Sequence, residues 1–350
     1  MGGFSLASCF LGGLEASKKE ALPPRPADPH SRSSVAATAP ALAFDELAAA
    51  TRNFRDDFRV VREGSLYKGY LKSVKQVVAI KLQHAVDPSQ PSSEQLNRAF
   101  LARVMTLSAL RHPNVVNLVG FCADGHHRIL VHEYMQLGSL QNHLHDRSPG
   151  QALLAWNTRM NIAAGVAKGL EYLHHKGVVY RRFMSSSDIL LGDGHHPKLS
   201  QYGLTNLGRI VAEDDEELCI DVTRTGTIAP EIAFTGKATM ESNVYSFGGL
   251  LLEMITGRRA FDRAQPAEDS HLVTWATRLM DRSQFRRMAD PALQGRYPSM
   301  DLQEALKVTF MCIHQQPDMR SPIGAVVAAL SRLAAYDGHP PESSHRAAPR

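Results

Sequence analysis

The chain has 350 residues, of which 43% are hydrophobic and 21% are charged, and its formal net charge is +4. This length is enough for about two domains or lobes, and the composition is that of an ordinary globular protein. The small net charge gives no reason to expect nucleic-acid binding. The four cysteines are too few for a disulfide framework and lack metal-ligand spacing, which suits a reducing intracellular compartment.

Residues 1–43 are predicted to form a disordered tail, because they are rich in Ala, Pro and Ser and have little to bury. They lack the basic start of a secretory signal, and no apolar run in the chain approaches the ~20 residues that span a bilayer. Gly2 follows the initiator Met, as N-myristoylation requires, although Leu6 replaces the expected hydroxyl residue. Cys9 is a candidate for palmitoylation, and stable anchoring needs two such signals. A lipid anchor and a plain tail both stay open.

The next segment predicts a small β-rich lobe over residues 44–135. A helix is expected over 44–54, with Phe44, Leu47, Ala48 and Phe54 on one face, and a second over 94–110, with Phe100, Leu101, Val104, Leu107 and Leu110 at helical spacing. Strands rich in β-branched residues are expected at 58–61, 66–71 and 76–82, and within 112–122 and 128–135.

The remaining pattern is mainly helical and predicts a larger lobe over residues 136–335. Helices are expected at 156–174, 243–256, 271–280, 302–313 and 322–333. Residues 336–350 are predicted to be a second disordered tail. The sequence therefore predicts an α+β chain of two lobes between two tails.

Six segments of the chain match the motifs of one family in the correct order. They are VAIK (78–81), HPNVVNLVG (112–120), LVHEYMQLGSL (130–140), Ala229-Pro230-Glu231, NVYSFGGLLLEMITGRRA (243–260) and PDMR (317–320). Over about residues 44–335 the chain resembles the protein kinases, most closely the plant receptor-like cytoplasmic kinases. The resemblance implies the bilobal kinase fold, with a small β-rich N-lobe that has one main helix, and a larger helical C-lobe.

The chain departs from this family where the chemistry is most demanding. Tyr180-Arg181-Arg182 stands where kinases have His/Tyr-Arg-Asp, and Arg182 cannot act as a base at neutral pH. Met184 replaces the lysine that contacts the γ-phosphate. Gln201 replaces the metal-binding Asp of Asp-Phe-Gly and is a weaker oxygen donor for Mg²⁺.

The cofactor-binding positions are also degenerate. Lys81 matches the lysine that contacts the α/β-phosphates, but Arg103 falls at the position of its glutamate partner, so that two cations face each other. Gly64 is the only clear glycine of the phosphate loop. The position of the metal-binding Asn is taken by Ser187 or Asp188, because the segment is one residue longer than in the family, and Asp188 could offer one carboxylate to a cation.

The adenine pocket is retained in outline. The resemblance places Leu66 and Ala79 above the base, Leu190 below it, and the backbone of Glu133 to Met135 at the hinge, with His132 as a bulky, polar gatekeeper. ATP is therefore expected to bind weakly at most, and Mg²⁺ binding has little support. A weak adenine site and an empty, collapsed cleft both stay open.

Residues that support the kinase fold are kept. Tyr180, Tyr202, Leu107 and Leu118 match the apolar spine that runs through both lobes. Glu231 and Arg320 match a buried ion pair. Asn243 replaces an Asp that anchors the catalytic-loop backbone, and it can still form hydrogen bonds.

The chain also carries an acidic run and three adjacent histidine pairs. The acidic run 213–217 lies in the activation segment and could pair with Arg181 and Arg182, although a solvated acidic loop explains it equally well. The three adjacent histidine pairs are poor chelators, because neighbouring side chains point in different directions.

These observations predict a catalytically impaired kinase-like protein, a pseudokinase. It would serve as a signalling scaffold or allosteric partner of active kinases or receptor kinases, at the cytoplasmic face of the plasma membrane or in the cytoplasm. The alternatives are a low-activity ATP-dependent Ser/Thr kinase that would use Asp188, and a nucleotide-binding sensor without turnover.

Overall fold

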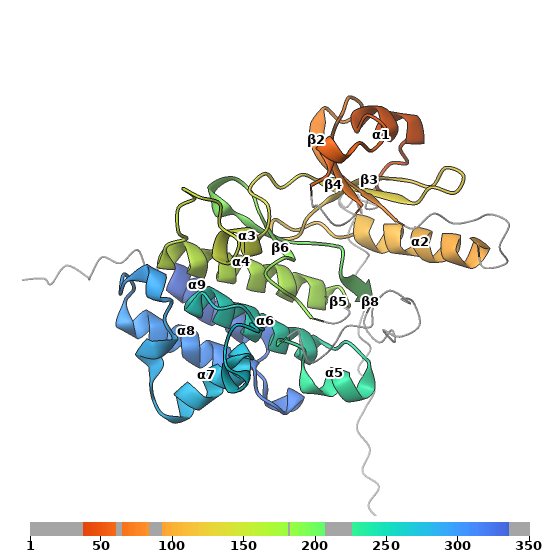
Figure 1. Ribbon diagram of the computed structural model, residues 1–350. Helices are drawn as coiled ribbons and strands as arrows, with labels where there is room; N and C mark the ends of the chain where they lie inside the picture. Colours follow the sequence, from red (N-terminus) through yellow and green to blue (C-terminus); the bar gives the residue numbers. More distant parts are fainter. Residues whose placement is uncertain (1–37, 61–64, 84–92, 181–182, 207–225, 336–350) are drawn as a thin grey trace, which may run out of the picture. The chain divides into compact units, whose positions relative to one another are not determined.

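The computed structural model describes residues 38–60, 65–83, 93–180, 183–206 and 226–335, all of which belong to one compact unit, residues 37–350. The first part of this unit combines a sheet with two helices (Figure 1). Its elements are α1 (Phe44–Ala50), β1 (Leu66–Leu71), β2 (Gln76–Leu82), α2 (Ser93–Ser108), β3 (Leu118–Cys122) and β4 (Ile129–Glu133). The predicted strands 66–71 and 76–82 are confirmed.

The second part is mainly helical. Its helices are α3 (Leu140–Leu144), α4 (Trp156–His175), α5 (Pro230–Thr235), α6 (Met240–Thr256), α7 (Leu272–Asp281), α8 (Ser299–Cys312) and α9 (Ile323–Ala335). In the described residues between α4 and α5 there are four short strands: β5 (Val178–Tyr180), β6 (Ile189–Leu191), β7 (Pro197–Leu199) and β8 (Leu204–Asn206). The predicted α+β kinase fold, a sheet with a helix followed by a larger helical region, is confirmed.

The four-stranded sheet is antiparallel, in the order β1-β2-β4-β3. Side chains alternate between its faces, so Val78 and Ile80 pack in a core that includes Leu47 of α1, while Ala79 and Lys81 lie on the opposite face. Pairing of β2 with β4 places His132 opposite Ala79. The alternation of β2 thus assembles the site face of the sheet.

Helix α1 is shorter than the sequence pattern predicts, because the chain turns sharply after Thr51. The Thr51 hydroxyl donates to the Leu47 carbonyl at 2.8 Å and accepts from the Phe54 amide at 3.1 Å. Arg52, Asn53 and Phe54 then have φ angles of 50°, 58° and 55°, which no right-handed helix allows. The Phe54 ring still packs, edge-on, against the Tyr67 ring of β1.

Two further predictions for this part are wrong in detail. The strand expected at 58–61 is replaced by a 3₁₀ turn, Asp56–Phe58, followed by a single bridge from Arg59 to Tyr67. Val61 lies outside the described residues. On α2, Leu101 is 44% exposed although its spacing suggested burial, because the buried stripe runs through Phe100, Val104 and Leu107.

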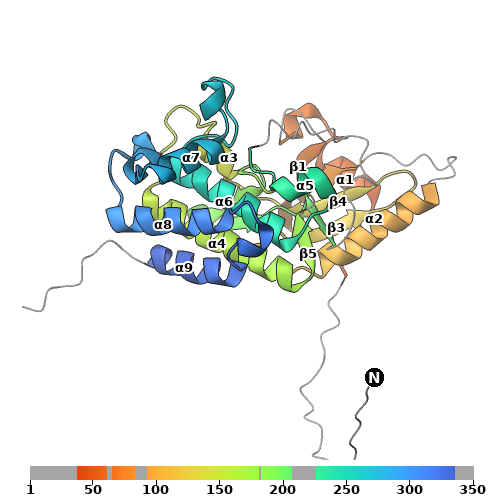
Figure 2. The same ribbon diagram turned by 90° about the horizontal axis from the view of Figure 1, so that it is seen from below.

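The helical part is built around α6, which is buried on nearly all sides. It starts three residues earlier than predicted, because Thr239 and Ser242 form a capping box, in which each side chain bonds the backbone of the other residue. Helix α6 packs on α4, α7 and α8, and α9 lies along α4, as two perpendicular views show (Figures 1 and 2). The predicted ion pair is confirmed: Arg320 donates to both Glu231 oxygens, at 2.6 and 2.8 Å.

Candidate functional site: a kinase-like nucleotide site with altered acids

The site face of the sheet presents Lys81 beside apolar and aromatic side chains. Lys81 of β2 is half-buried and pairs across the sheet with Leu66 of β1 and Leu130 of β4. Ala79, two residues earlier, lies on the same face and is buried. The structure therefore brings together Leu66, Ala79 and Lys81, the three described residues predicted to touch adenine or phosphate from above. Gly64 lies outside the described residues.

The segment after β4 is fastened to strands β6 and β7. The Glu133 carboxylate accepts two hydrogen bonds from the Lys198 ammonium, at 2.7 and 2.8 Å, and two from Asn117. The Met135 carbonyl accepts from the Gly138 amide at 3.2 Å. Leu190 of β6, predicted to lie below the base, forms a bridge with Ser139. These contacts hold the predicted hinge and the floor residue together.

The segment around Tyr180 is anchored from α6. The Asn243 side chain accepts from the Tyr180 amide at 2.7 Å and donates to the Tyr180 carbonyl at 3.0 Å. The second bond needs the amide N–H, which an aspartate lacks. The Tyr180 hydroxyl donates to the Ser200 carbonyl at 2.6 Å. Asn243 thus holds the backbone at this point, as the sequence predicted.

After Tyr180, the described residue that stands at a phosphate-binding position of the resembled family, Met184, has no phosphate-binding side chain. Arg181 and Arg182 lie outside the described residues. Met184, at the position predicted to hold the γ-phosphate lysine in active relatives, is completely buried in the main apolar core. An uncharged, buried thioether cannot contact a triphosphate.

Asp188 and Ser187, the two candidates for the metal-binding Asn position, differ in their surroundings. Asp188 directly precedes β6, and its backbone carbonyl accepts from the Ser200 amide at 2.8 Å, whereas Ser187 is exposed. The Asp188 carboxylate accepts from the Ser185 amide at 3.0 Å and from the Ser185 hydroxyl at 2.8 Å. Burial raises the pKa of the Asp188 carboxyl, against the effect of these two hydrogen bonds. One oxygen of the carboxylate that could bind a cation, Oδ2, is thus already used in a local turn.

Gln201 is directed toward helix α2. Its side chain is 1% exposed, and its amide donates to the Leu107 carbonyl at 3.4 Å, a long hydrogen bond at the last turn of α2. The side-chain oxygen of Gln201, Oε1, has no hydrogen-bond partner within the described part of the chain. The position that carries a metal-binding carboxylate in the resembled family here holds a neutral, enclosed amide.

Arg103 links α2 to the same segment. Its guanidinium donates to the Tyr202 carbonyl at 2.8 Å. Two predicted spine residues, Leu107 and Leu118, are buried nearby, and the Tyr202 ring meets the His132 ring edge-on at 5.1 Å. A side chain–backbone contact from Arg103 therefore joins α2 to Tyr202. In the resembled family the residue at the Arg103 position is a glutamate that forms an ion pair with the lysine of β2.

His132, the predicted gatekeeper, is enclosed beside Gln201, whose side chain acts to raise the His132 pKa against the larger effects of burial and Arg103. His132 is 1% exposed, and neither ring nitrogen has a hydrogen-bond partner among the residues described. Burial, and secondarily the Arg103 cation, lower the pKa of His132 to about 3. The ring is therefore neutral at physiological pH. Burial of its two nitrogens without a hydrogen-bond partner lowers the free energy of unfolding.

These residues fit a nucleobase better than a metal-bound triphosphate. Leu66, Ala79 and Leu190 supply the apolar surfaces, and the hinge backbone is ordered beside them. For a cation, the described side chains offer an enclosed amide at Gln201 and an already bonded carboxylate at Asp188. No group of three His, Cys, Asp or Glu side chains in the described ranges is placed to hold a metal ion.

Sequence reasoning missed several contacts of this site. The Glu133–Lys198 ion pair joins residues 65 positions apart, and no local pattern indicates it. The Ser185–Asp188 turn had a signal, since Ser and Asp three residues apart commonly bond locally. Gly2, Cys9 and the acidic run 213–217 lie outside the described residues, so their predicted roles stay predictions.

Comparison with known proteins identifies the class. The protein tyrosine and serine/threonine kinase family matches residues 55–330, so the chain belongs to this family of protein kinases. Membership implies an ATP site. None of the helices in the described ranges is long and apolar enough to cross a membrane.

Among individual proteins, the chain is similar to plant kinases of Arabidopsis thaliana. The chain is 51% identical to the probable serine/threonine-protein kinase PBL7 over 305 residues, which cover 85% of this chain and 78% of that protein. It is 48% identical to serine/threonine-protein kinase PBS1 over 345 residues, covering 96% and 72%. It is 50% identical to serine/threonine-protein kinase PBL27 over 304 residues, which cover 85% of this chain but 58% of PBL27. The similarity is thus to PBS1-like receptor-like cytoplasmic kinases.

Proposed function

We propose that this chain is a catalytically impaired kinase, a pseudokinase, that acts as a signalling scaffold or allosteric partner of active kinases or receptor kinases. The observation that carries this proposal is the pair of replacements Arg182 and Gln201. Loss of a general base alone typically costs about 10²–10⁴-fold in rate. Loss of the metal clamp removes electrostatic stabilisation of the transition state, which is usually the larger contribution.

The surroundings of Gln201 support this proposal. Its amide faces the Leu107 carbonyl inside the protein, and Asp188, the nearest carboxylate in the motif, accepts both of its bonds from Ser185. Gln201 offers Mg²⁺ only a neutral, enclosed amide oxygen, and one oxygen of the Asp188 carboxylate is bonded to Ser185, whereas Mg²⁺ prefers carboxylates and phosphate oxygens in octahedral geometry. Packing residues of the fold are retained, so the protein keeps a surface for partners while its chemistry is weakened.

The similarity to named serine/threonine-protein kinases favours a second candidate, a low-activity ATP-dependent Ser/Thr kinase. Sequence identity to these proteins supports a low-activity kinase better than it supports a pseudokinase. Lys81 is retained in the VAIK motif, and Asp188 is the carboxylate that such activity would depend on. A nucleotide-binding sensor without turnover is the third candidate, since adenine contacts are separable from phosphate contacts.

One preparation can separate the three candidates. The full chain is titrated with ATP, with and without Mg²⁺, while thermal unfolding is followed, and phosphate transfer is measured on the same samples. Lys81→Ala is the control. A pseudokinase gives no transfer above the control, a sensor gives an ATP-dependent shift without transfer, and a low-activity kinase gives Mg²⁺-dependent transfer that the control loses.

We further propose that the chain works at the cytoplasmic face of the plasma membrane, through acylation at Gly2 and Cys9, or otherwise in the cytoplasm. The position of Gly2 after the initiator Met supports this proposal, and so does the need for two acyl chains in stable anchoring. Mass spectrometry of the N-terminal peptide from plant cells tests the acylation, and unmodified Gly2 and Cys9 would contradict the membrane location and leave the cytoplasm.

A further inference from the structure

The first described residues of the chain run along the outer strand of the four-stranded sheet. The Phe121 amide of β3 donates to the Pro40 carbonyl at 3.1 Å, and the Leu42 amide donates to the Phe121 carbonyl at 2.7 Å. Ala41 and Phe121 form a parallel bridge. Because β3 is an end strand of this sheet, these bonds satisfy backbone groups that a sheet edge leaves unpaired. We call residues 39–42 the strap.

The start of the strap is bound to the end of helix α2. The Ala39 amide donates to the Ser108 hydroxyl at 3.2 Å, and both residues are buried. Ser108 is the last residue of α2. Ala39 also belongs to the same apolar core as Val104 and Leu107 of that helix. The strap therefore joins the last turn of α2 through a buried hydrogen bond within a shared core.

The close approach of the strap to β3 depends on Gly120. A Cβ atom at this position would lie 2.6 Å from Leu42 Cδ1 and 3.0 Å from the Pro40 carbonyl oxygen, whereas carbon atoms pack at about 3.5–4.0 Å. Leu42 is buried in the apolar core on one side of the sheet. The chain beyond the strap is fastened as well, since the Phe44 amide donates to the Asp124 carboxylate at 3.0 Å. A side chain at residue 120 would therefore push the strap away from β3.

The same end of α2 holds the segment that stands for the metal-binding motif. The Leu107 carbonyl accepts from the Gln201 side-chain amide at 3.4 Å, and the Arg103 guanidinium donates to the Tyr202 carbonyl at 2.8 Å. Leu107 directly precedes Ser108, so adjacent residues bind the strap and the nucleotide-site segment. One helical turn thus connects the two.

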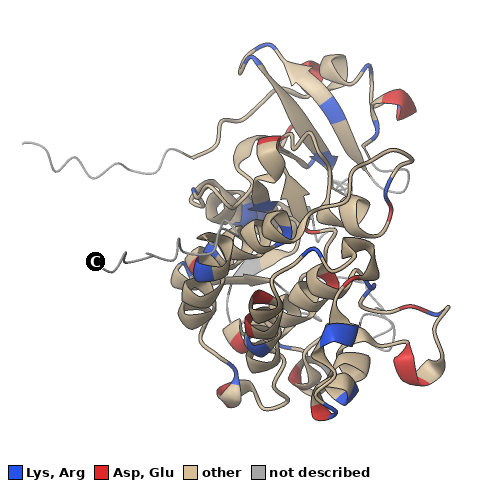
Figure 3. Cartoon of the chain, turned by 90° about the vertical axis from the view of Figure 1, so that its left-hand side faces the viewer, with Lys and Arg blue, Asp and Glu red and all other residues tan. Residues whose placement is uncertain are grey.

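The strap carries no charge of its own. Residues 38–43 contain no Asp, Glu, Lys or Arg, and they belong to the tan part of the chain in Figure 3. The described contacts of the strap are hydrogen bonds and apolar packing. Salt screens interactions between exposed charges. The attachment of the strap is therefore expected to be independent of ionic strength.

We infer that the strap is a positioning segment of the nucleotide site. It fixes the last turn of α2 through Ser108, and this turn fixes Gln201 and Tyr202. Residues 1–37 lead directly into the strap, so displacement of the strap from this end of the chain would loosen the site without any contact to nucleotide. The significance of this coupling rests on the proposed nucleotide site. The experiment below measures the coupling alone, so it can fail or succeed whether or not ATP binds.

Residue-resolved amide hydrogen exchange of the full chain tests the coupling. Ser108→Ala removes the acceptor of the Ala39 amide. We expect at least about fivefold faster exchange of the Ala109 and Leu204 amides, which report on the end of α2 and on the segment after Gln201. The acceleration should be the same at low and at high salt.

Gly120→Ala displaces the strap itself rather than its anchor. It should speed exchange of the Leu42 amide and of the same two reporter amides by a similar factor. Gly69→Ala is the matched control, because a Cβ atom there would also be crowded, at 3.0 Å from Ile80 and 3.2 Å from Ala50, but its nearest neighbours lie outside the strap. It should leave both reporter amides unchanged.

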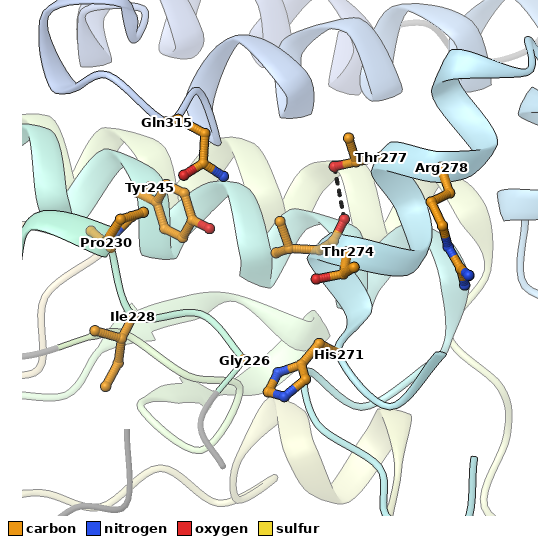
Figure 4. Close-up of a pocket in the computed structure, with 11 residues that line it drawn as sticks. Gly226, Ile228, Pro230, Tyr245, His271, Thr274, Thr277, Arg278 and Gln315 are labelled. Atoms are coloured by element: carbon orange, nitrogen blue, oxygen red, sulfur yellow. Dashed lines mark hydrogen bonds between the residues drawn. The ribbon is translucent and has the colours of Figure 1, made fainter. Parts of the chain in front are cut away.

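Thr277→Val is the control for loss of a helix hydroxyl. The Thr277 hydroxyl donates to the Val273 carbonyl of the same helix, α7, at 2.9 Å, in the wall of a pocket (Figure 4). Helix α7 lies far from α2 in both perpendicular views (Figures 1 and 2). The reporter amides in this variant should exchange as in the unaltered chain.

A double-mutant cycle gives the decisive result. Arg103→Leu removes the hydrogen bond from α2 to the Tyr202 carbonyl. If the strap acts through this turn of the helix, Ser108→Ala should accelerate Leu204 exchange at least about twofold less in the Arg103→Leu chain than in the unaltered chain. Equal acceleration in both chains, Leu204 exchange that Ser108→Ala or Gly120→Ala leaves unchanged, or equal acceleration of every amide including those of α7 would each overturn the inference. Circular dichroism confirms that each variant is folded.

Discussion

Replacement of His132 by Leu should stabilise the protein, and increasingly so as the pH falls. Leu fills a similar volume, and it removes two ring nitrogens that are buried without a partner in the described structure. A buried polar group left unsatisfied costs about 1–3 kcal/mol. We therefore expect His132→Leu to raise the free energy of unfolding by about 2 kcal/mol at pH 7.

The pH dependence follows from the pKa of His132. In the unfolded chain this pKa is near 6.5, whereas in the folded protein burial, followed by the Arg103 cation, lowers it to about 3. Between these values the unfolded state binds a proton that the folded state does not bind, so stability falls as the pH falls. The loss is about 1.4 kcal/mol per pH unit, or roughly 2 kcal/mol between pH 6.5 and 5. His132→Leu lacks this loss.

Urea unfolding of both proteins at pH 7 and pH 5 measures the effect. The advantage of His132→Leu should grow by about 2 kcal/mol between the two conditions. His174→Leu is a positive control that should show a similar growth, because burial also lowers the pKa of His174, to about 4, at a site remote from α2. A gain in unfolding free energy from His132→Leu that is the same at pH 7 and pH 5 would refute the reasoning. Such a result would mean that the His132 ring takes up its proton in the folded protein as readily as in the unfolded chain.

Three other changes test contacts that hold the helical part of the fold and the site. Arg320→Met leaves Glu231 without its partner and should cost about 3 kcal/mol of unfolding free energy, because half of a largely buried ion pair is removed. Asn243→Asp keeps the acceptor for the Tyr180 amide but turns a carboxylate toward the Tyr180 carbonyl, and it should cost about 1–3 kcal/mol. Arg103→Leu removes the bond to residue 202 and should speed amide exchange in the last turn of α2 without global unfolding.

Each of these results has a clear contrary outcome. Urea midpoints that do not move for the first two variants would show that the ion pair and the double amide contact contribute nothing net. Unchanged hydrogen exchange in the third would show that the guanidinium does not hold α2 to the segment that follows Gln201.

Much of the fold was predictable because its elements carry strong local patterns. The strands around Val78 and Ile80 combine β-branched residues with turn signals on either side, and the structure places them as expected. Helix α1 was mispredicted beyond Thr51, because a side chain–backbone turn overrides the apolar spacing that Phe54 continues. Such turns depend on hydroxyl geometry, which periodicity does not encode.

The site was predictable in its residue types and less so in their orientation. The sequence identifies Gln201 and Asp188 as the residues that stand for metal ligands, but it does not say where their side chains point. The structure directs one amide to the Leu107 carbonyl and engages the carboxylate with Ser185. These orientations depend on contacts between distant segments, as does the Glu133–Lys198 pair, and they need three-dimensional information.

Phosphate transfer from radiolabelled ATP by the purified full chain tests the central claim most directly. The experiment compares the unaltered chain with Lys81→Ala, in the presence and absence of Mg²⁺, with a generic acceptor protein and with trace kinases excluded. We predict that the two proteins give the same background signal. Mg²⁺-dependent incorporation that rises with enzyme concentration and is lost in Lys81→Ala would contradict the account.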